Sequence, residues 1–158
     1  MADIDAPHRL VPHIVCAGAN SAIDFYKAAF DAKEMIRLNA PNGQLAHGSV
    51  SINGGMVMLV DENVGMGMAG PKHLGGTPVT IHLSVDDADA AVAKAVAAGA
   101  RVIMPVAEQF WGDRYGVIED PFGHRWSIAT PGKNAPRTNE ALLEAMKKAG
   151  PMPPSARK

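Results

Sequence analysis

The chain has 158 residues and carries 15 Lys and Arg against 16 Asp and Glu, which gives a formal net charge of -1. About 100–200 residues is typical of a single domain, and a composition of 47% hydrophobic and 20% charged residues indicates a folded protein. The balanced charge argues against nucleic acid or an anionic membrane surface as a partner, because both favour a basic surplus.

Cysteine usage and the N-terminal residues indicate the compartment. The single cysteine, Cys16, excludes an internal disulfide and is typical of a reducing environment. The opening residues, MADIDAPHRL, lack the apolar core of a signal peptide. No apolar run reaches the roughly 18 residues that a membrane-spanning helix needs. We therefore expect a cytoplasmic protein with no membrane and no nucleic-acid partner.

The first half of the chain predicts the element order β-α-β-β-β. A polar arm covers 1–9, and the short apolar run at 10–16 predicts a strand. Apolar residues at helical spacing predict a helix over 19–30, with Asn20 or Ser21 as its N-cap. Turn signals then separate three expected strands, at 33–39, 43–52 and 55–61.

The second half predicts the same order after a glycine-rich linker. The linker, 62–77, has no periodicity and reads as a mobile loop. A strand is expected at 79–85 and a helix at 88–98, with Asp86 or Asp87 as the N-cap. Three further strands are expected at 101–106, 113–119 and 124–129.

An internal repeat relates the two halves. An offset of about 69 residues places His13 on His82 and Cys16 on Val85, so we expect two pseudo-symmetric modules. The expected organisation is an arm at 1–9, one domain at 10–130 built from modules 10–61 and 78–130 joined by linker 62–77, and a tail at 131–158 with a short charged helix at about 138–148.

Three segments carry a resemblance to a known family: AIDFYKAAF, GGTPVTIHLSVDDADAAVAKAVAAGA and GDRYGVIEDPFGHRWSIAT. Over residues 10–130 the chain resembles the vicinal oxygen chelate superfamily, which includes glyoxalase I, bleomycin- and fosfomycin-resistance proteins and extradiol dioxygenases, and within it the PhnB-like branch. The resemblance implies an α+β fold in which two pseudo-symmetric βαβββ modules form a cup-shaped sheet.

The resemblance also implies where a divalent metal would bind. Metal-dependent members place His and Glu ligands on the first and last strand of each module, which corresponds here to Val11, Leu59, Thr80 and Ser127. These residues do not make a ligand set, so we expect no tightly bound ion at that position and assign no cofactor. A displaced divalent metal remains the alternative, with candidate ligands His13, His47, His82 and Glu119.

The repeat places His13 and His82 at equivalent strand positions, two residues beyond the metal slots. We interpret them as a catalytic pair that faces one cup and handles protons. The alternative is two separate histidines, each satisfied by local hydrogen bonds. His47 lies on a middle strand, where its repeat mate is near Tyr115, and it either lines the cup or faces solvent.

A second candidate site is the segment WGDRY at 111–115. Trp111 and Tyr115 supply flat apolar walls, and the Arg114 guanidinium can hold a carboxylate or phosphate with parallel hydrogen bonds. We predict that these three residues bind an anionic or planar ligand at the cup mouth. The alternative is that Asp113 or Glu119 neutralises Arg114.

These patterns leave three functional hypotheses. The first is a glyoxalase/bleomycin-resistance/dioxygenase-like protein that binds a small organic molecule in the cup. The second is a metal-dependent lyase or dioxygenase with a displaced His-based site, and the third is a drug-sequestering resistance protein, which needs no catalytic group. Whether the chain is an enzyme stays open. We also expect a homodimer, since the flexible linker 62–77 would permit exchange of modules between chains.

Overall fold

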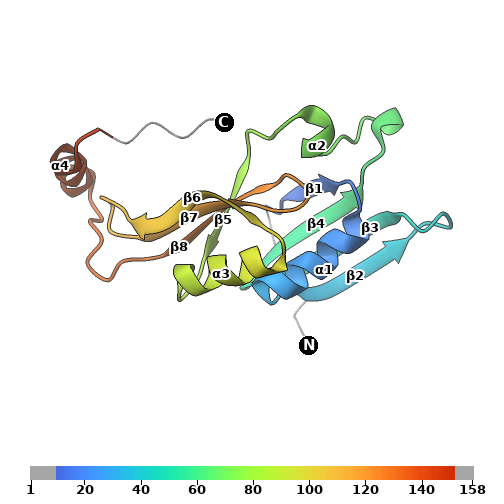
Figure 1. Ribbon diagram of the computed structural model, residues 1–158, viewed down its shortest axis with the longest axis horizontal. Helices are drawn as coiled ribbons and strands as arrows, with labels where there is room; N and C mark the ends of the chain where they lie inside the picture. The colour runs from blue at the N-terminus through green and yellow to red at the C-terminus, as the bar shows by residue number, and fades with distance from the viewer. Residues whose placement is uncertain (1–9, 152–158) are drawn as a thin grey trace.

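The computed structural model describes residues 10–151 and consists of two βαβββ modules followed by a helix (Figure 1). The first module contains β1 (His13–Cys16), α1 (Ala19–Phe30), β2 (Lys33–Asn39), β3 (Leu45–Ile52) and β4 (Gly55–Asp61). The second contains β5 (Thr80–Ser84), α3 (Ala88–Ala98), β6 (Arg101–Glu108), β7 (Arg114–Glu119) and β8 (Arg125–Thr130), and α4 (Asn139–Ala149) follows. The predicted α+β fold of two βαβββ modules is confirmed. The predicted arm, 1–9, and the end of the tail, 152–158, lie outside the described residues.

Each module forms its own four-stranded sheet. The strand orders are β1-β4-β3-β2 and β5-β8-β7-β6, with the first strand of each module parallel to the last. His13 pairs with Met58 in the first sheet, and His82 pairs with Ser127 in the second. Both members of the second pair follow the first by the same 69 residues, so the repeat predicted from the sequence is also the repeat of strand register.

A carboxylate holds the start of both α1 and α3. The helix α1 begins after Gly18, whose φ of 94° lies in the left-handed region, and the Asp61 carboxylate accepts hydrogen bonds from the backbone N–H of Gly18 and Ala19. The predicted caps Asn20 and Ser21 are therefore wrong, because both lie inside the helix. In α3 the predicted cap Asp87 is confirmed, since its carboxylate accepts from the N–H of Ala90.

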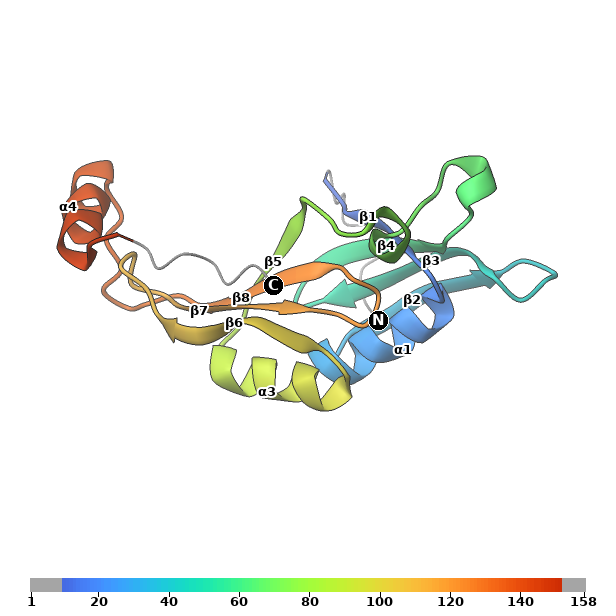
Figure 2. The ribbon, with the colours of Figure 1, turned by 45° about the horizontal axis from the view of Figure 1, so that its top comes forward.

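The two helices lie side by side and join the modules (Figures 1 and 2). Aromatic rings of α1 extend the contact to the second module: Phe30 lies 4.9 Å from Trp126, and Phe25 lies 6.3 Å from Phe122, between ring centroids. The modules therefore share one apolar core. No helix within residues 10–151 is long and apolar enough to cross a membrane.

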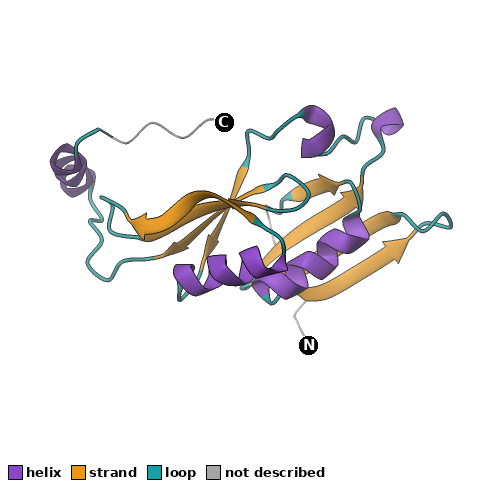
Figure 3. Ribbon diagram, viewed as in Figure 1, coloured by secondary structure: helices purple, strands orange, loops and turns teal. Residues whose placement is uncertain are grey.

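The helices cover only one face of each sheet (Figure 3). On the first sheet Ile14, Gly48 and Leu59 face α1, so alternation places their strand neighbours on the opposite face. That opposite face includes Ile36 and Leu38, which are 46% and 59% exposed. We call the two faces that α1 and α3 leave uncovered the open faces.

The connection between the modules is more ordered than the sequence predicts. Expected as a mobile loop, it contains a 3₁₀ turn, Val64–Met66, and a short helix, α2 (Pro71–Leu74), which begins with a proline at its first turn. The Glu62 carboxylate accepts a hydrogen bond from the N–H of Gly70 and so closes the segment on itself. The linker consequently supplies fixed residues to the junction between the sheets.

Cys16 lies at the end of β1 inside the core, with no solvent exposure. Burial, with a smaller contribution from the nearby Asp120 carboxylate, raises the pKa of its thiol far above the ordinary value. The thiol stays protonated across the physiological range, which suits a structural role in the core rather than nucleophilic chemistry.

Candidate functional site

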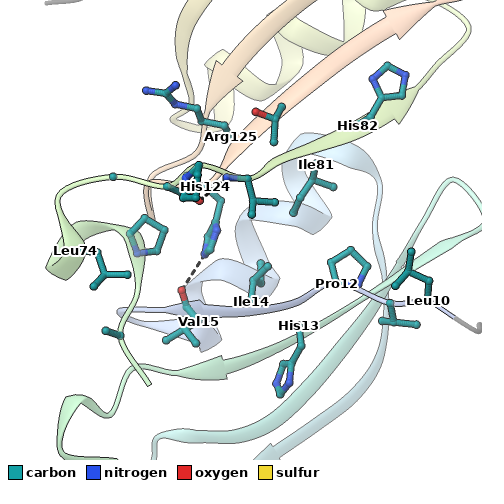
Figure 4. Close-up of a pocket in the computed structure, with 18 residues that line it drawn as sticks. Leu10, Pro12, His13, Ile14, Val15, Leu74, Ile81, His82, His124 and Arg125 are labelled. Carbon is teal, nitrogen blue, oxygen red and sulfur yellow. Dashed lines mark hydrogen bonds between the residues drawn. The ribbon is translucent and has the colours of Figure 1, made fainter. Parts of the chain in front are cut away.

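A pocket with a volume of about 630 Å³ lies where the two modules meet (Figure 4). This is within the range of about 300–1,000 Å³ that is usual for small-molecule sites. We call it the junction pocket. Its walls are mainly apolar and come from three segments: 10–15 around β1, 69–79 in the linker, and 80–82 in β5, with His124 and Arg125 at one end.

Two hydrogen bonds of equivalent position hold the modules together, and the first of them borders this pocket. The His124 imidazole Nε2 lies 2.8 Å from the Val15 carbonyl oxygen and donates to it, because a carbonyl can only accept (Figure 4). In the opposite direction the Asn53 amide donates to the carbonyl of Ser84 at 2.6 Å. Ser84 follows Val15 by 69 residues, so each module reaches across to the same place in the other.

Arg125 is the cationic group at the rim of the junction pocket, and its guanidinium points outward from the pocket (Figure 4). It begins β8, where its Cα partners are Thr80 and Glu119, and its side chain lies on the open face of the second sheet. Within residues 10–151 Arg125 has neither an ion-pair nor a side-chain hydrogen-bond partner, because its neighbour Glu119 binds Arg101 at 3.0 Å. An unpaired guanidinium at the rim of an apolar pocket suits the charged end of an organic anion.

The structure does not bring the predicted pair His13 and His82 together. Both line the junction pocket, but their imidazoles point away from each other, each over the open face of its own sheet (Figure 4). His13 instead meets His47, with ring centroids 6.4 Å apart. The proton-handling role proposed for His13 and His82 as one pair therefore lacks the contact that it requires.

In the second module His82 is held by its own sheet. Its Nδ1 lies 2.9 Å from the Ser127 hydroxyl, and its Nε2 lies 3.5 Å from the Ser84 hydroxyl. The Tyr115 ring stacks against it at 6.3 Å, and Trp111 packs edge-on against Tyr115 at 5.4 Å. The predicted ligand residues Trp111 and Tyr115 thus form an aromatic row with His82 on the open face.

Arg114, predicted to bind an anion beside that row, lies on the other side of the sheet. Its guanidinium makes two hydrogen bonds, of 2.6 and 2.7 Å, to the Asp89 carboxylate on α3. The partner is neither Asp113 nor Glu119, and the pair lowers the pKa of Asp89 through the hydrogen bond from Arg114. Arg114 and Tyr115 are consecutive strand residues, so they must point to opposite faces.

The metal slots implied by the family do not fit a divalent ion. Val11, Thr80 and Ser127 supply no carboxylate or imidazole, and the predicted fourth slot, Leu59, is buried against α1. The strand register equates Ser127 with Met58 instead of Leu59, and Met58 is not a ligand of the usual oxygen and nitrogen type. Within residues 10–151, no group of three or more His, Cys, Asp or Glu side chains could hold a metal.

A chain of two βαβββ modules with a pocket at their junction has the architecture of glyoxalase-like proteins. The chain belongs to the Glyoxalase/Bleomycin resistance protein/Dioxygenase superfamily, whose family model matches residues 8–128.

Its relatives bear out the membership without assigning an activity. An uncharacterized protein of Mycobacterium tuberculosis (strain H37Rv) is 50% identical over 131 residues, which cover 81% of this chain and 77% of that one. The crystal structure of an Arabidopsis thaliana gene product is 31% identical and covers 78% of this chain and 97% of that one, with a TM-score of 0.62. The structure of TioX from Micromonospora sp. ML1 is 26% identical and covers 77% and 96%, with the same TM-score.

Proposed function

We propose that the protein binds a small organic anion with an apolar body in the junction pocket. The observation that carries the proposal is the combination of a pocket of about 630 Å³ with mainly apolar walls and, at its rim, the guanidinium of Arg125, which has no partner within residues 10–151. Apolar walls bind the body of a ligand, and a single charge fixes its orientation. Two narrower proposals accompany it: that the chain belongs to the PhnB-like branch of its superfamily, and that the organic anion is a drug which the protein sequesters.

Binding without metal chemistry is the form that the donor set supports. The family's lyases and dioxygenases polarise substrate oxygens on a divalent ion, and the equivalent slots here carry Val11, Met58, Thr80 and Ser127. The His82 imidazole, already bonded to the hydroxyl of Ser127, would act on a ligand only as a hydrogen-bond partner or proton carrier.

The test uses matched ligand pairs and a matched pair of arginines. Aromatic and aliphatic carboxylates and phosphonates, each beside its neutral amide or ester, are titrated while the tryptophan fluorescence is followed. We expect the acids to bind more tightly, and Arg125→Ala to weaken the acids alone by roughly 10- to 100-fold, the equivalent of a hydrogen bond to a charged group.

Arg114→Ala is the control, because its guanidinium is held by Asp89 on the opposite side of the sheet. It should leave every affinity unchanged. The proposal fails if no member of the panel binds saturably, if acids and their neutral partners bind equally, or if the two arginine variants behave alike.

We further propose that two chains pair through their open faces. Exposed Ile36 and Leu38 make an apolar surface on the first sheet that a lone chain leaves in water. Light scattering at micromolar concentration should give twice the chain mass, and Leu38→Asp should halve it. Val96→Asp, at an exposed apolar position on α3 away from the open faces, is the control. A monomeric mass for the unmodified chain would refute the proposal.

A further inference from the structure

Two histidines on the open face of the first sheet have no partner in the described chain. His13 is on β1 and His47 on β3, and their rings meet edge-on across β4 with centroids 6.4 Å apart. Within residues 10–151 neither imidazole has a hydrogen bond or an ion pair; His13 is exposed and His47 is half-buried. Two imidazoles that share a metal at about 2.0–2.1 Å have centroids roughly 5–6.5 Å apart, so the spacing suits a shared ion.

A methionine lies on the strand between the two histidines. Met58 on β4 is the Cα partner of both His13 and Ser49, so its side chain emerges on the same open face. His47 precedes Ser49 by two residues on β3 and shares that face. The strand between the two histidines therefore carries a thioether side chain on the same face, directly opposite His13.

The second module provides an internal comparison. The positions equivalent to His13 and Met58 are His82 and Ser127, and the mate of His47 is Tyr115. There the imidazole is satisfied by hydroxyl groups at 2.9 and 3.5 Å and stacked on the tyrosine. At these equivalent strand positions the second module has one histidine that is held by hydrogen bonds, whereas the first module has two imidazoles and a thioether.

We propose that His13, His47 and Met58 form a site for a soft monovalent ion, Cu(I). Thioether sulfur selects Cu(I), and imidazole accepts it, whereas hard ions such as Mg²⁺ and Ca²⁺ require oxygen ligands. Zinc sites are built from Cys, His, Asp and Glu, and no group of three such side chains exists within residues 10–151. The site lies on the open face of the first sheet beside Leu38, the Cα partner of His47, so it would border the contact between two paired chains. It is apart from the metal slots of the family and does not depend on the ligand proposed for the junction pocket.

The experiment is an anaerobic titration of the full chain against a Cu(I)–bicinchoninate complex, whose colour is lost when the protein withdraws the ion. We expect one Cu(I) per chain. His47→Tyr and Met58→Ser, which install the residues of the second module, and the milder Met58→Leu should each weaken binding by at least about tenfold, since the loss of one ligand changes site affinity by about this much or more. X-ray absorption should show a copper–sulfur distance that Met58→Leu removes.

His73→Ala and Met66→Leu are matched controls, because both residues are exposed in the linker, outside the strands β1, β3 and β4 that carry the three ligands. Circular dichroism confirms that each variant is folded. The proposal is overturned if the unmodified chain withdraws no copper, if the controls lose as much affinity as the ligand variants, or if no copper–sulfur distance is seen. Because His47 and Met58 do not line the junction pocket, their variants should leave binding of organic anions intact.

Discussion

Replacing Asp120 with alanine should destabilise the protein by roughly 3–5 kcal/mol, because each buried donor left without an acceptor costs about 1–3 kcal/mol. The carboxylate, only 3% exposed, accepts from the N–H groups of Phe122 and His124 on one oxygen. On the other oxygen it accepts from the Tyr26 hydroxyl at 2.7 Å and the Trp126 indole at 3.0 Å. Tyr26 belongs to the first module, so this one carboxylate joins the turn of one module to the helix of the other.

Urea unfolding at neutral pH measures the effect. Burial, reinforced by the Asp120 carboxylate, raises the pKa of Tyr26 well above its ordinary value, so the hydroxyl keeps its proton and donates throughout the usable pH range. Asp24→Ala is the control: its carboxylate is exposed and pairs with Arg37, and the change should cost no more than about 1 kcal/mol. Equal effects for Asp120 and Asp24 would contradict the role assigned to the buried network.

The fold was predictable because its signals are local. Turn residues and hydrophobic periodicity determine where the strands and helices begin and end, and β2, α1 and α3 have the predicted bounds. The misplaced cap of α1 shows the limit of such signals. The group that holds this helix start is Asp61, more than 40 residues away in the chain, and no local pattern identifies a partner at that distance.

The site was predicted less well because side-chain direction decides it. Trp111 and Tyr115 do meet, but alternation along β7 places Arg114 on the opposite face of the sheet from Tyr115. The cationic residue at the junction pocket is Arg125. That alternation was available in the sequence. The relative orientation of the two sheets could not be predicted from the sequence. In this orientation the side chains of His13 and His82 point away from each other, although the two residues occupy equivalent places in the repeat (Figure 4).

The second large effect is expected at Trp126, the largest fully buried side chain. It lies on β8 between Arg125 and Ser127, and its ring packs against Tyr26 and Phe30 of α1 at centroid distances of 5.3 and 4.9 Å. Trp126→Ala should cost about 3–5 kcal/mol, since truncation of a buried aromatic residue leaves a cavity that the surrounding core fills only in part.

The comparison with the other tryptophan separates stability from binding. Trp111 lies half-buried in the loop before β7. Trp111→Ala should therefore change the free energy of unfolding far less than Trp126→Ala. It removes the ring that packs edge-on against Tyr115 in the aromatic row. Trp126→Phe keeps an aromatic ring in the core and leaves Arg125 on the open face, so it should lower stability without changing affinity for organic anions. If Trp126→Phe remained folded but lost that affinity, the core packing of β8 would itself be part of the binding site, and the separation between the two faces of this strand would be wrong.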